Sequence, residues 1–287
     1  MIKKKKDRLR VGRINYLNIW PIFEIIKNEP VIEHIDFISG HPSLLNTGLD
    51  QGTIDLSPSS SFEYLAHGEK YRLLPNLGIS AGNEIKSVLF CMPFVFDQLE
   101  KHVLQGGRVL LSTASAASAA LLKVIWHYYW KLPAPVWSQS MPGQSLDSGE
   151  PFLEIGDHAL NIFVYPRPGF CIIDLAAEWK KFTGLPFVFA LWILNREVSP
   201  DKYEILKELE ICIRKAVDSL PGMVDELAQK YHNRHFRPDM IKDYWQKMDF
   251  CLGPEHLAGL ALFGRYLTDL KIISGMPVLD FVKDGRA

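Results

Sequence analysis

Uncharged hydrogen-bond donors make up most of the side chains in this sequence whose positions suggest chemistry. The segment "DLSPSSSFEYL" at 55–65 carries four serines, and "STASAAS" at 112–118 carries three serines and a threonine. With other polar residues that follow short apolar segments, the candidates are Asn18, Ser57, Ser59, Ser60, Ser87, Thr113, Ser115 and Asp157. Such groups can hold a small anion by hydrogen bonds, but serine and threonine also cap helices, so both interpretations stay open at each cluster.

The sequence lacks the patterns that accompany most other catalytic chemistries. It has no phosphate loop, no G-x-G-x-x-G, no serine–histidine–aspartate order and no histidines or cysteines at metal-ligand spacing. His158, beside Asp157, is the only histidine near the polar clusters, and it could be a catalytic base or a packing residue. We therefore expect no metal and no cofactor.

Composition narrows the class of protein. Acidic and basic residues nearly balance, 33 against 32, so the formal net charge of −1 offers no basic field for nucleic acid. No apolar run approaches the roughly 18 residues of a membrane helix. The cysteines are far apart and form no C-x-x-C pair, which favours reduced thiols in a cytoplasmic protein. We expect a monomer or homodimer whose partner is a small molecule, with neither nucleic acid nor membrane involved.

The elements that must position the polar clusters alternate between strand and helix at the start of the chain. Strands are predicted at 9–14, 35–40 and 53–58, with helices at 18–26 and 41–52 between them. This alternation predicts a mostly parallel α/β sheet, in which polar residues at the carboxyl ends of the strands gather at one edge.

The middle of the chain predicts a second lobe. Two long apolar segments near 87–96 and 185–194 enclose it, and we interpret them as crossings between two lobes. Lobe 1 is then formed by 8–92 and 193–287, and lobe 2 by 93–192; a single continuous sheet is the alternative. Apolar residues at helical spacing predict helices at 201–220, 223–232, 238–248 and 255–270.

Two lobes joined by two crossings form a hinge around a cleft that can close over a small molecule. A helix that begins at such a cleft presents unpaired backbone N–H groups, and these bind carboxylates or phosphates readily. The residues alone predict a two-lobed binder of a small anion and leave open whether it is an enzyme.

Six segments resemble, in order, segments of the chorismate dehydratase family of menaquinone biosynthesis. They are "VGRINYLNIWPIFE", "GTIDLSPSSSFEY", "LLPNLGISAGNEIKSVLF", "LLSTASAASAALLKVI", "EIGDHAL" and "DLAAEWKKFTGLPFVFALWIL". The resemblance runs from about residue 10 to 195 and is weaker in the helical C-terminal part. It implies the two-lobed type II periplasmic-binding-protein fold, used by a cytoplasmic enzyme.

The resemblance also implies a reaction. Members of the family convert chorismate to 3-[(1-carboxyvinyl)oxy]benzoate and water, which opens the futalosine route to menaquinone. The C3 proton and the C4 hydroxyl leave, and the ring becomes aromatic. The implied mechanism is substrate-assisted: the carboxylate of the enolpyruvyl arm takes the C3 proton, and fixed geometry makes such an internal transfer efficient.

Position by position, the resemblance assigns roles to the candidates. Asn18 matches the asparagine of an N-x-x-P turn and Ser87 the serine that begins the first crossing, and both are expected at the reacting region. The expected substrate-binding residues are Ser57, Ser59 and Ser60 for one carboxylate, Thr113 and Ser115 for the other, and Asp157 of the "GD" pair.

This chain departs from the family pattern in the second hydroxyl cluster. Ala117 stands at a usual threonine and Ser112 at a usual aspartate, so backbone N–H groups are expected to take over one anion contact. The nearest rival function is that of the sister family that makes 1,4-dihydroxy-6-naphthoate. A non-catalytic receptor for a small anion is the alternative from another class.

Overall fold

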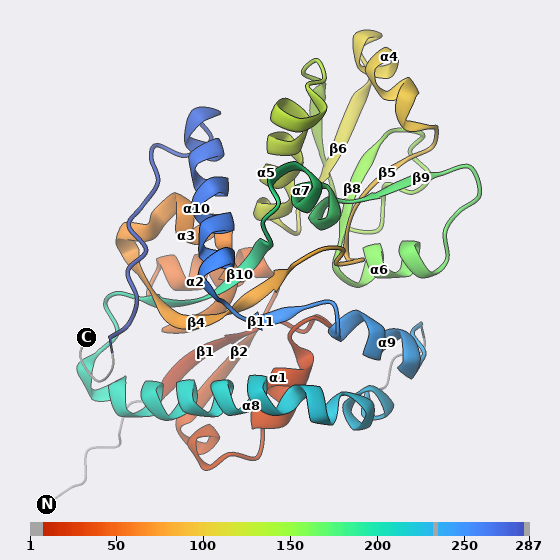
Figure 1. Cartoon of the computed structure of the whole chain (residues 1–287). Coiled ribbons are helices and arrows are strands. Elements are labelled where there is room, and N and C mark those ends of the chain that lie inside the picture. Colours follow the sequence, from red (N-terminus) through yellow and green to blue (C-terminus); the bar gives the residue numbers. More distant parts are fainter. Residues whose placement is uncertain (1–7, 232–234, 284–287) are drawn as a thin grey trace, which may run out of the picture.

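The computed structural model describes residues 8–231 and 235–283, which form two lobes with one β-sheet each (Figure 1). The strands are β1 (Leu9–Arg13), β2 (Ile35–Ser39), β3 (Leu56–Ser60), β4 (Tyr71–Ala81), β5 (Val88–Met92), β6 (Arg108–Ser112), β7 (Val136–Ser140), β8 (Phe152–Ile155), β9 (Cys171–Asp174), β10 (Phe187–Asn195) and β11 (Asp249–Cys251). The helices are α1 (Trp20–Ile26), α2 (Pro42–Asp50), α3 (Ser61–His67), α4 (Leu99–Leu104), α5 (Ala116–Val124), α6 (Gly156–Val164), α7 (Leu175–Thr183), α8 (Tyr203–Lys230), α9 (Pro238–Trp245) and α10 (Pro254–Asp269).

Short helical turns complete the chain between these elements. They are the 3-10 turns η1 (Pro30–His34), η2 (Gly68–Lys70), η3 (Phe96–Gln98) and η5 (Pro200–Lys202), and the π-helical turn η4 (Ile125–Trp130) that extends α5.

The sheet of lobe 1 has six strands in the order β11-β4-β10-β3-β1-β2. β1 pairs in parallel with β2 and β3, as the strand–helix alternation predicts. β10 instead pairs antiparallel with both β3 and β4. The expectation of a mostly parallel sheet therefore holds only for the first three strands, because the returning chain enters this sheet from the opposite direction.

The sheet of lobe 2 has five strands in the order β7-β6-β8-β5-β9. β6 pairs in parallel with β7 and β8, whereas β5 pairs antiparallel with β8 and β9. Both sheets thus combine parallel and antiparallel pairs, and in lobe 1 β11 also pairs antiparallel with β4.

The crossings lie at 82–87 and 184–186, outside the two long apolar strands. The sequence-based limits put 88–92 in lobe 1 and 187–192 in lobe 2, but β5 belongs to the second sheet and all of β10 to the first. Both strands are apolar throughout because they are buried centrally, and such a run does not reveal which sheet it joins. The last four residues of the expected first lobe, 284–287, lie outside the described part of the chain.

Asp174, at the end of β9, connects the first crossing to α7, the helix that precedes the second crossing. Its Oδ2 accepts hydrogen bonds from the backbone N–H groups of Ile85 (2.9 Å) and Lys86 (2.6 Å). Its Oδ1 caps α7 by accepting from Ala176 and Ala177. One partly buried carboxyl group therefore ties the start of α7 to the segment that leads into lobe 2.

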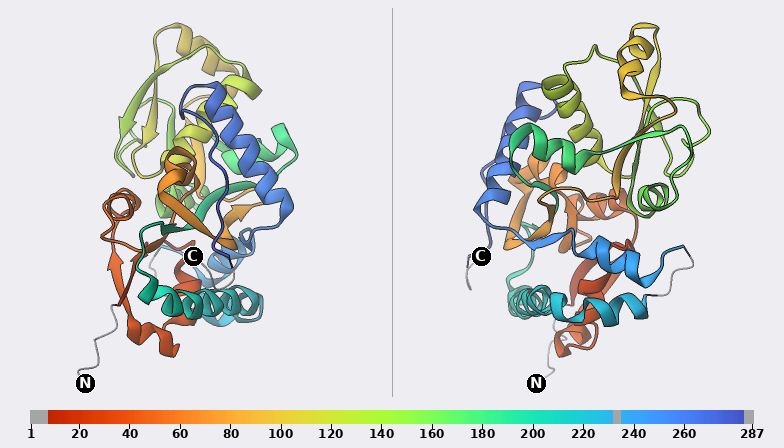
Figure 2. Two further views of the ribbon diagram at one scale, coloured as in Figure 1. Left: turned by 90° about the vertical axis from the view of Figure 1, so that its left-hand side faces the viewer. Right: turned by 45° about the vertical axis from the view of Figure 1, so that its right-hand side comes forward.

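The C-terminal part is helical, as the apolar spacing predicts, but with one difference. Helices were expected at 201–220 and 223–232, since Pro221 and Gly222 separate them, whereas α8 runs without a break from Tyr203 to Lys230. Its buried residues Leu220, Val224 and Leu227 continue one apolar face across the proline. Figure 2 shows α8 beneath lobe 1 and the segment after α10 returning along the side of that lobe.

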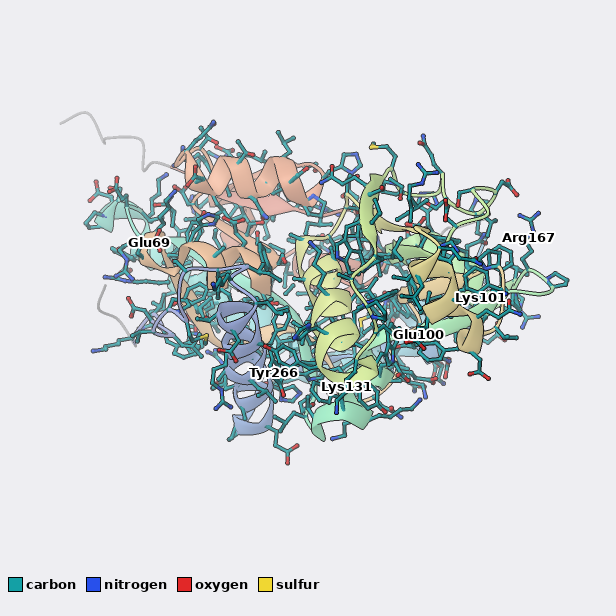
Figure 3. The ribbon with its side chains drawn as sticks, turned by 90° about the horizontal axis from the view of Figure 1, so that it is seen from above. Glu69, Glu100, Lys101, Lys131, Arg167 and Tyr266 are labelled. Carbon is teal, nitrogen blue, oxygen red and sulfur yellow. The ribbon has the colours of Figure 1, made fainter. Side chains whose placement is uncertain are left out.

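Aromatic rings join the two lobes beside the crossings. α10 lies next to α5 when the molecule is viewed from above (Figure 3). The rings of Tyr128 in η4 and Tyr266 in α10 have centroids 4.5 Å apart, and Tyr266 also stacks on Phe182 at the end of α7. Among the described residues, no helix is long and apolar enough to cross a membrane.

Candidate active site

A pocket of about 990 Å³, partly open to solvent, lies between the two lobes. Both lobes and the first crossing line it, through Ile14, Tyr16, Asn18, Ile19, Pro42, Ser43, Asn46, Pro58, Ser59, Ser60, Ile79, Ile85, Ser87, Val88, Thr113, Ala114, Ser115, Ala116, Ser118, Ile155, Gly156, Phe189 and Ala190. The pocket therefore combines apolar walls with hydroxyl and amide groups.

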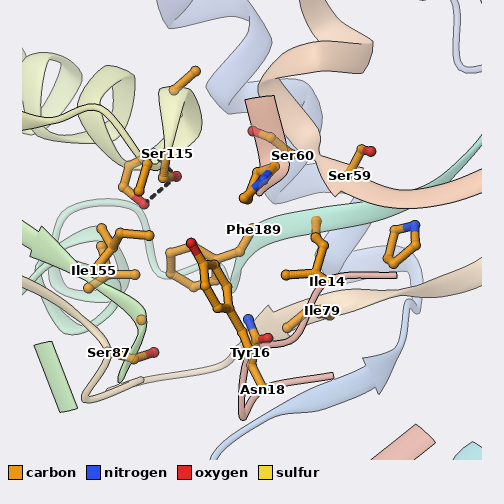
Figure 4. A pocket seen from close by; sticks show the side chains of 18 of the residues that line it. Ile14, Tyr16, Asn18, Ser59, Ser60, Ile79, Ser87, Ser115, Ile155 and Phe189 are labelled. Atoms are coloured by element: carbon orange, nitrogen blue, oxygen red, sulfur yellow. Dashed lines mark hydrogen bonds between the residues drawn. The ribbon is translucent and has the colours of Figure 1, made fainter. Parts of the chain in front are cut away.

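The two residues expected at the reacting region both face this pocket (Figure 4). Asn18 lies in the loop between β1 and α1, and its side chain makes no hydrogen bond to any described residue. Ser87 ends the first crossing, is 5% exposed, and has its Oγ 2.9 Å from the Tyr244 hydroxyl. The structure thus brings together an amide and a hydroxyl that are 69 positions apart in sequence.

On the lobe 1 side, two buried polar atoms of the pocket have no protein partner. Ser59 is 1% exposed, and its Oγ makes no hydrogen bond within the described residues. The buried Oδ1 of Asn46, on α2, is also without a partner there. Unpaired buried polar atoms are uncommon and each costs about 1–3 kcal/mol, so they mark places where a ligand or water must supply the partner.

Ser60 caps a helix and also lines the pocket. Its Oγ accepts a hydrogen bond from the N–H of Phe62 at 3.3 Å, which caps α3. Its side chain also lines the pocket beside Ser59, as Figure 4 shows.

On the lobe 2 side, the start of α5 faces the pocket. Ser115 is the N-cap, and its Oγ accepts from the N–H of Ser118 at 3.1 Å. The N–H groups of Ser115, Ala116 and Ala117 have no acceptor in the described part of the chain. Thr113 lies in the turn before the helix and also lines the pocket. Three unpaired N–H groups and the helix dipole make this end of the pocket attractive to an anion.

None of the lining residues is charged, and Tyr16 is the one whose side chain titrates. Burial, together with the nearby carboxyl groups of Asp157 and Glu154, raises the pKa of Tyr16, so its hydroxyl stays protonated. Burial also raises the pKa of both Glu154 and Asp157, although backbone N–H groups that bond to them act in the opposite direction. The pocket therefore offers neutral donors and no ordinary general base.

Two of the expected substrate-binding residues do not line the pocket. Ser57 is fully buried on β3, where a side-chain atom at Gly12 of β1 would collide with it, so it faces the neighbouring strand. Asp157 is at the start of α6, and its Oδ1 accepts from the N–H of Leu17 at 3.4 Å. It therefore links lobe 2 to the loop that carries Asn18. His158 is exposed and lies outside the lining set, beside Gly143.

Sequence reasoning missed several residues of the pocket. Tyr16 projects from the β1–α1 loop between the serines of the two lobes (Figure 4). Ser43 and Asn46 share one face of α2, because residues three apart on a helix are neighbours. This i, i+3 polar pair in "HPSLLNTGLDQG" was a usable signal. Phe189 and Ile155 supply apolar walls, and nothing local distinguishes them from core residues.

The two lobes, each built on one sheet, define the fold class, which is that of the periplasmic-binding-protein-like folds. A protein from Archaeoglobus fulgidus superposes with a TM-score of 0.74 at 17% identity, over 94% of this chain and all of that one. The periplasmic aliphatic sulphonate binding protein from Escherichia coli gives 0.64 at 12% identity, over 98% and 94% of the two chains. These likenesses confirm the predicted two-lobed periplasmic-binding-protein fold.

Within this class, the sequence defines the family. The chain belongs to the menaquinone biosynthesis family, whose sequence pattern it matches over residues 9–269. Chorismate dehydratase from Thermus thermophilus is 27% identical over 273 residues, which cover 90% of this chain and 94% of that protein. Chorismate dehydratase from Campylobacter jejuni is 31% identical over 183 residues, 62% of this chain and 64% of that protein. The family inferred from the six segments is confirmed.

Proposed function

We propose that this protein is a hydro-lyase that converts chorismate to 3-[(1-carboxyvinyl)oxy]benzoate and water. The observation that carries the proposal is the interlobe pocket, which has many neutral donors but no charged side chain among its lining residues. Such a site suits an anionic substrate that brings its own base. The two similar chorismate dehydratases support the same substrate.

The positions of the helix starts and apolar side chains around the pocket suit a ring that carries two carboxylates. α5 begins at the pocket from lobe 2, and α2 begins there from lobe 1 with Pro42 and Ser43 among the lining residues. A helix start on each lobe gives each carboxylate its own set of N–H donors. Apolar residues between them, such as Ile79 and Phe189, can cover the faces of the ring.

In the proposed mechanism, the enolpyruvyl carboxylate removes the C3 proton while Asn18 and Ser87 hydrogen-bond to the C4 hydroxyl as it departs with its electron pair. The carboxylate's proton completes the released water, and the six-membered ring becomes aromatic. The protein contributes placement, which is effective because holding the carboxylate over its own ring replaces a bimolecular proton transfer by an internal one. Closure of the lobes would exclude water and strengthen the hydrogen bonds to the leaving group.

We further propose that the protein acts in the cytoplasm. Cys91, Cys171, Cys212 and Cys251 are free thiols, which suits a reducing compartment.

Incubation of the purified protein with chorismate, followed by mass spectrometry, tests the proposal. We expect a product lighter than chorismate by one water, with the ultraviolet absorbance of a benzoate. Chorismate that binds but is not consumed would instead indicate a non-catalytic receptor. Chorismate that neither binds nor reacts, together with formation of 1,4-dihydroxy-6-naphthoate from its own precursor, would favour the sister activity.

Substitutions at the reacting region test the site itself. Ser87→Ala and Asn18→Ala should each lower kcat by about a hundredfold, since each removes a donor to the departing hydroxyl, a loss of roughly 3 kcal/mol. The melting temperature of Asn18→Ala should stay near that of the wild type, because the Asn18 side chain bonds to no described residue. Ser87→Ala leaves the buried Tyr244 hydroxyl without its acceptor and should lose about 1–3 kcal/mol of stability while still folding. Wild-type kcat in both folded variants would refute this placement.

A further inference from the structure

Two residues at the end of α9 form hydrogen bonds to Ser87 and to the residue before Asn18, the two residues that we place at the reacting region. Tyr244 and Trp245 are adjacent in sequence and 2% exposed each, and neither lines the pocket. Tyr244 bonds to Ser87, and Trp245 bonds to the backbone of Leu17, the residue before Asn18. From the sequence, a helix is expected at 238–248, but nothing local connects it with the pocket.

The Tyr244 hydroxyl donates a hydrogen bond to Ser87 Oγ at 2.9 Å, and both groups are buried. Ser87 Oγ has no other hydrogen-bond partner among the described residues. With the lone-pair side of Oγ held by Tyr244, the hydrogen of Ser87 is free to point into the pocket. The tyrosine thus turns a freely rotating hydroxyl into a donor aimed at a ligand.

Tyr244 remains a donor over the whole usable pH range. Burial raises the pKa of its hydroxyl, and the nearby carboxyl groups of Asp157 and Asp174 act in the same direction, although the hydrogen bond with Ser87 opposes them. The direction of the Tyr244–Ser87 bond is therefore insensitive to pH.

Trp245 fixes α9 where Tyr244 can reach Ser87. Its Nε1 donates to the carbonyl oxygen of Leu17 at 2.8 Å, and its ring stacks on Trp20 of α1 with centroids 5.8 Å apart and planes 4° apart. From the other lobe, Asp157 accepts the N–H of the same Leu17. The peptide next to Asn18 is held from both sides.

We propose that Tyr244 is a positioning residue, which orients the Ser87 hydroxyl toward the substrate while Trp245 anchors the helix that carries it. The proposal rests on the function assigned above, because it gives Ser87 its role in the reaction. The residues that act in the reaction then include one on α9, because Tyr244 lies 157 positions after Ser87 in the sequence.

Tyr244→Phe removes only the hydroxyl and is the first test. We expect kcat for chorismate to fall about tenfold while KM changes by less than about threefold, the effect of one hydrogen bond that acts in the transition state. Tyr64→Phe is the matched control. Tyr64 is equally buried, and its hydroxyl bonds to the backbone of Val278 and Asp280, away from the pocket. This control should lose as much thermal stability as Tyr244→Phe and keep its kcat.

A double-mutant cycle separates positioning from general packing. If Tyr244 acts through Ser87, adding Tyr244→Phe to Ser87→Ala should lower kcat by less than about twofold more. Full additivity of the two effects, or wild-type kcat in Tyr244→Phe, would overturn the proposal.

Crystal structures of the wild type and Tyr244→Phe give a readout that does not depend on turnover. We expect Ser87 to leave its wild-type rotamer or to occupy several, since serine has three staggered wells of similar energy. An unchanged Ser87 rotamer in the variant would overturn the positioning role even if the wild type proved inactive on chorismate. Absence of turnover by the wild type would refute the proposed function separately.

Discussion

At the scale of single residues, the side-chain oxygen atoms of Ser59 and Asn46 are the pocket groups most available to a ligand. Both atoms are buried without a protein partner in the described part of the chain. Neighbouring Ser61, also buried, donates to the carbonyl oxygen of Val188 at 2.7 Å and is satisfied. The hydroxyl of Ser61 therefore has a structural role, whereas the hydroxyl of Ser59 is available to bind a ligand.

Ser59→Ala should separate stability from binding. Removal of an unpaired buried hydroxyl should leave the free energy of unfolding unchanged or raise it by up to about 1 kcal/mol. The dissociation constant of chorismate should rise about tenfold, since a hydrogen bond to a charged group is lost. Urea unfolding and calorimetric titration measure the two quantities.

Ser61→Ala is the control for this pair and should behave in the opposite way. Loss of its bond to Val188 should cost about 1 kcal/mol of stability, while chorismate affinity stays at the wild-type value. Equal affinities in the two variants would contradict the role given to Ser59.

At the scale of elements, α5 begins at the end of the pocket where we propose that an anion binds. The resemblance led us to expect aspartate and threonine where this chain has Ser112 and Ala117, and neither of these two residues lines the pocket. Ser115 and Ala116 do line it, and their N–H groups have no acceptor in the described part of the chain. The expectation that backbone donors take over this contact is consistent with that geometry and stays a proposal.

Ser115→Asp should keep the helix and remove the anion site. Aspartate is as good an N-cap as serine and interacts favourably with the helix dipole, so stability should change by less than about 1 kcal/mol. The added negative charge should weaken chorismate binding by at least about tenfold, because it would face a carboxylate at close range. Titration calorimetry at low ionic strength measures the effect.

Ser199→Asp controls for the change in net charge. Ser199 precedes η5 and is not among the pocket residues. An equal loss of affinity in both variants would show that the effect of Ser115→Asp is not local.

At the scale of the whole molecule, carboxyl groups that the pocket does not use hold the lobes in register. Asp157 bonds across the cleft to Leu17, and Asp174 ties the first crossing to α7. Burial raises the pKa of Asp157, so its ionised form is disfavoured in the folded protein. Such a group stabilises the fold while it is protonated, and that contribution is lost as the pH rises through its raised pKa.

Asp157→Asn should therefore become more stable relative to the wild type as the pH rises. The asparagine side chain can still accept a hydrogen bond from the N–H of Leu17. Because it cannot ionise, the variant avoids the decrease in stability that ionisation of Asp157 causes in the wild type. We expect the difference in free energy of unfolding, variant minus wild type, to increase from about pH 4 to about pH 7. Urea titrations at both pH values measure it.

Asp55→Asn should show the opposite trend. Burial works against ionisation of Asp55, but hydrogen bonds from Arg10 and Lys202 outweigh it and lower the pKa. Its contribution to stability is present at neutral pH and is lost on acidification, so the deficit of the variant should shrink as the pH falls. The same trend in both variants would contradict the assignment for Asp157.

The sequence by itself determined the local elements and the family. The strands expected at 9–14, 35–40 and 53–58 correspond to β1, β2 and β3, and the helices expected at 18–26 and 41–52 correspond to α1 and α2. Capping residues, glycine and apolar spacing act over a few positions, so a short segment contains the information. The polar clusters at strand ends were found in the same way, and most of them line the pocket.

Only the tertiary structure decided which polar side chains line the pocket and which buried residues hydrogen-bond to those side chains from outside it. β3 continues through the serine cluster to Ser60, and its pairing with β1 places Ser57 beside Gly12, whereas Ser59, two residues further along the same face, lines the pocket. Tyr244 meets Ser87 because α9 packs against lobe 1 after more than 150 intervening residues. Side-chain direction and such long-range contacts follow from strand register and helix packing, which depend on the whole folded chain and leave no local signature.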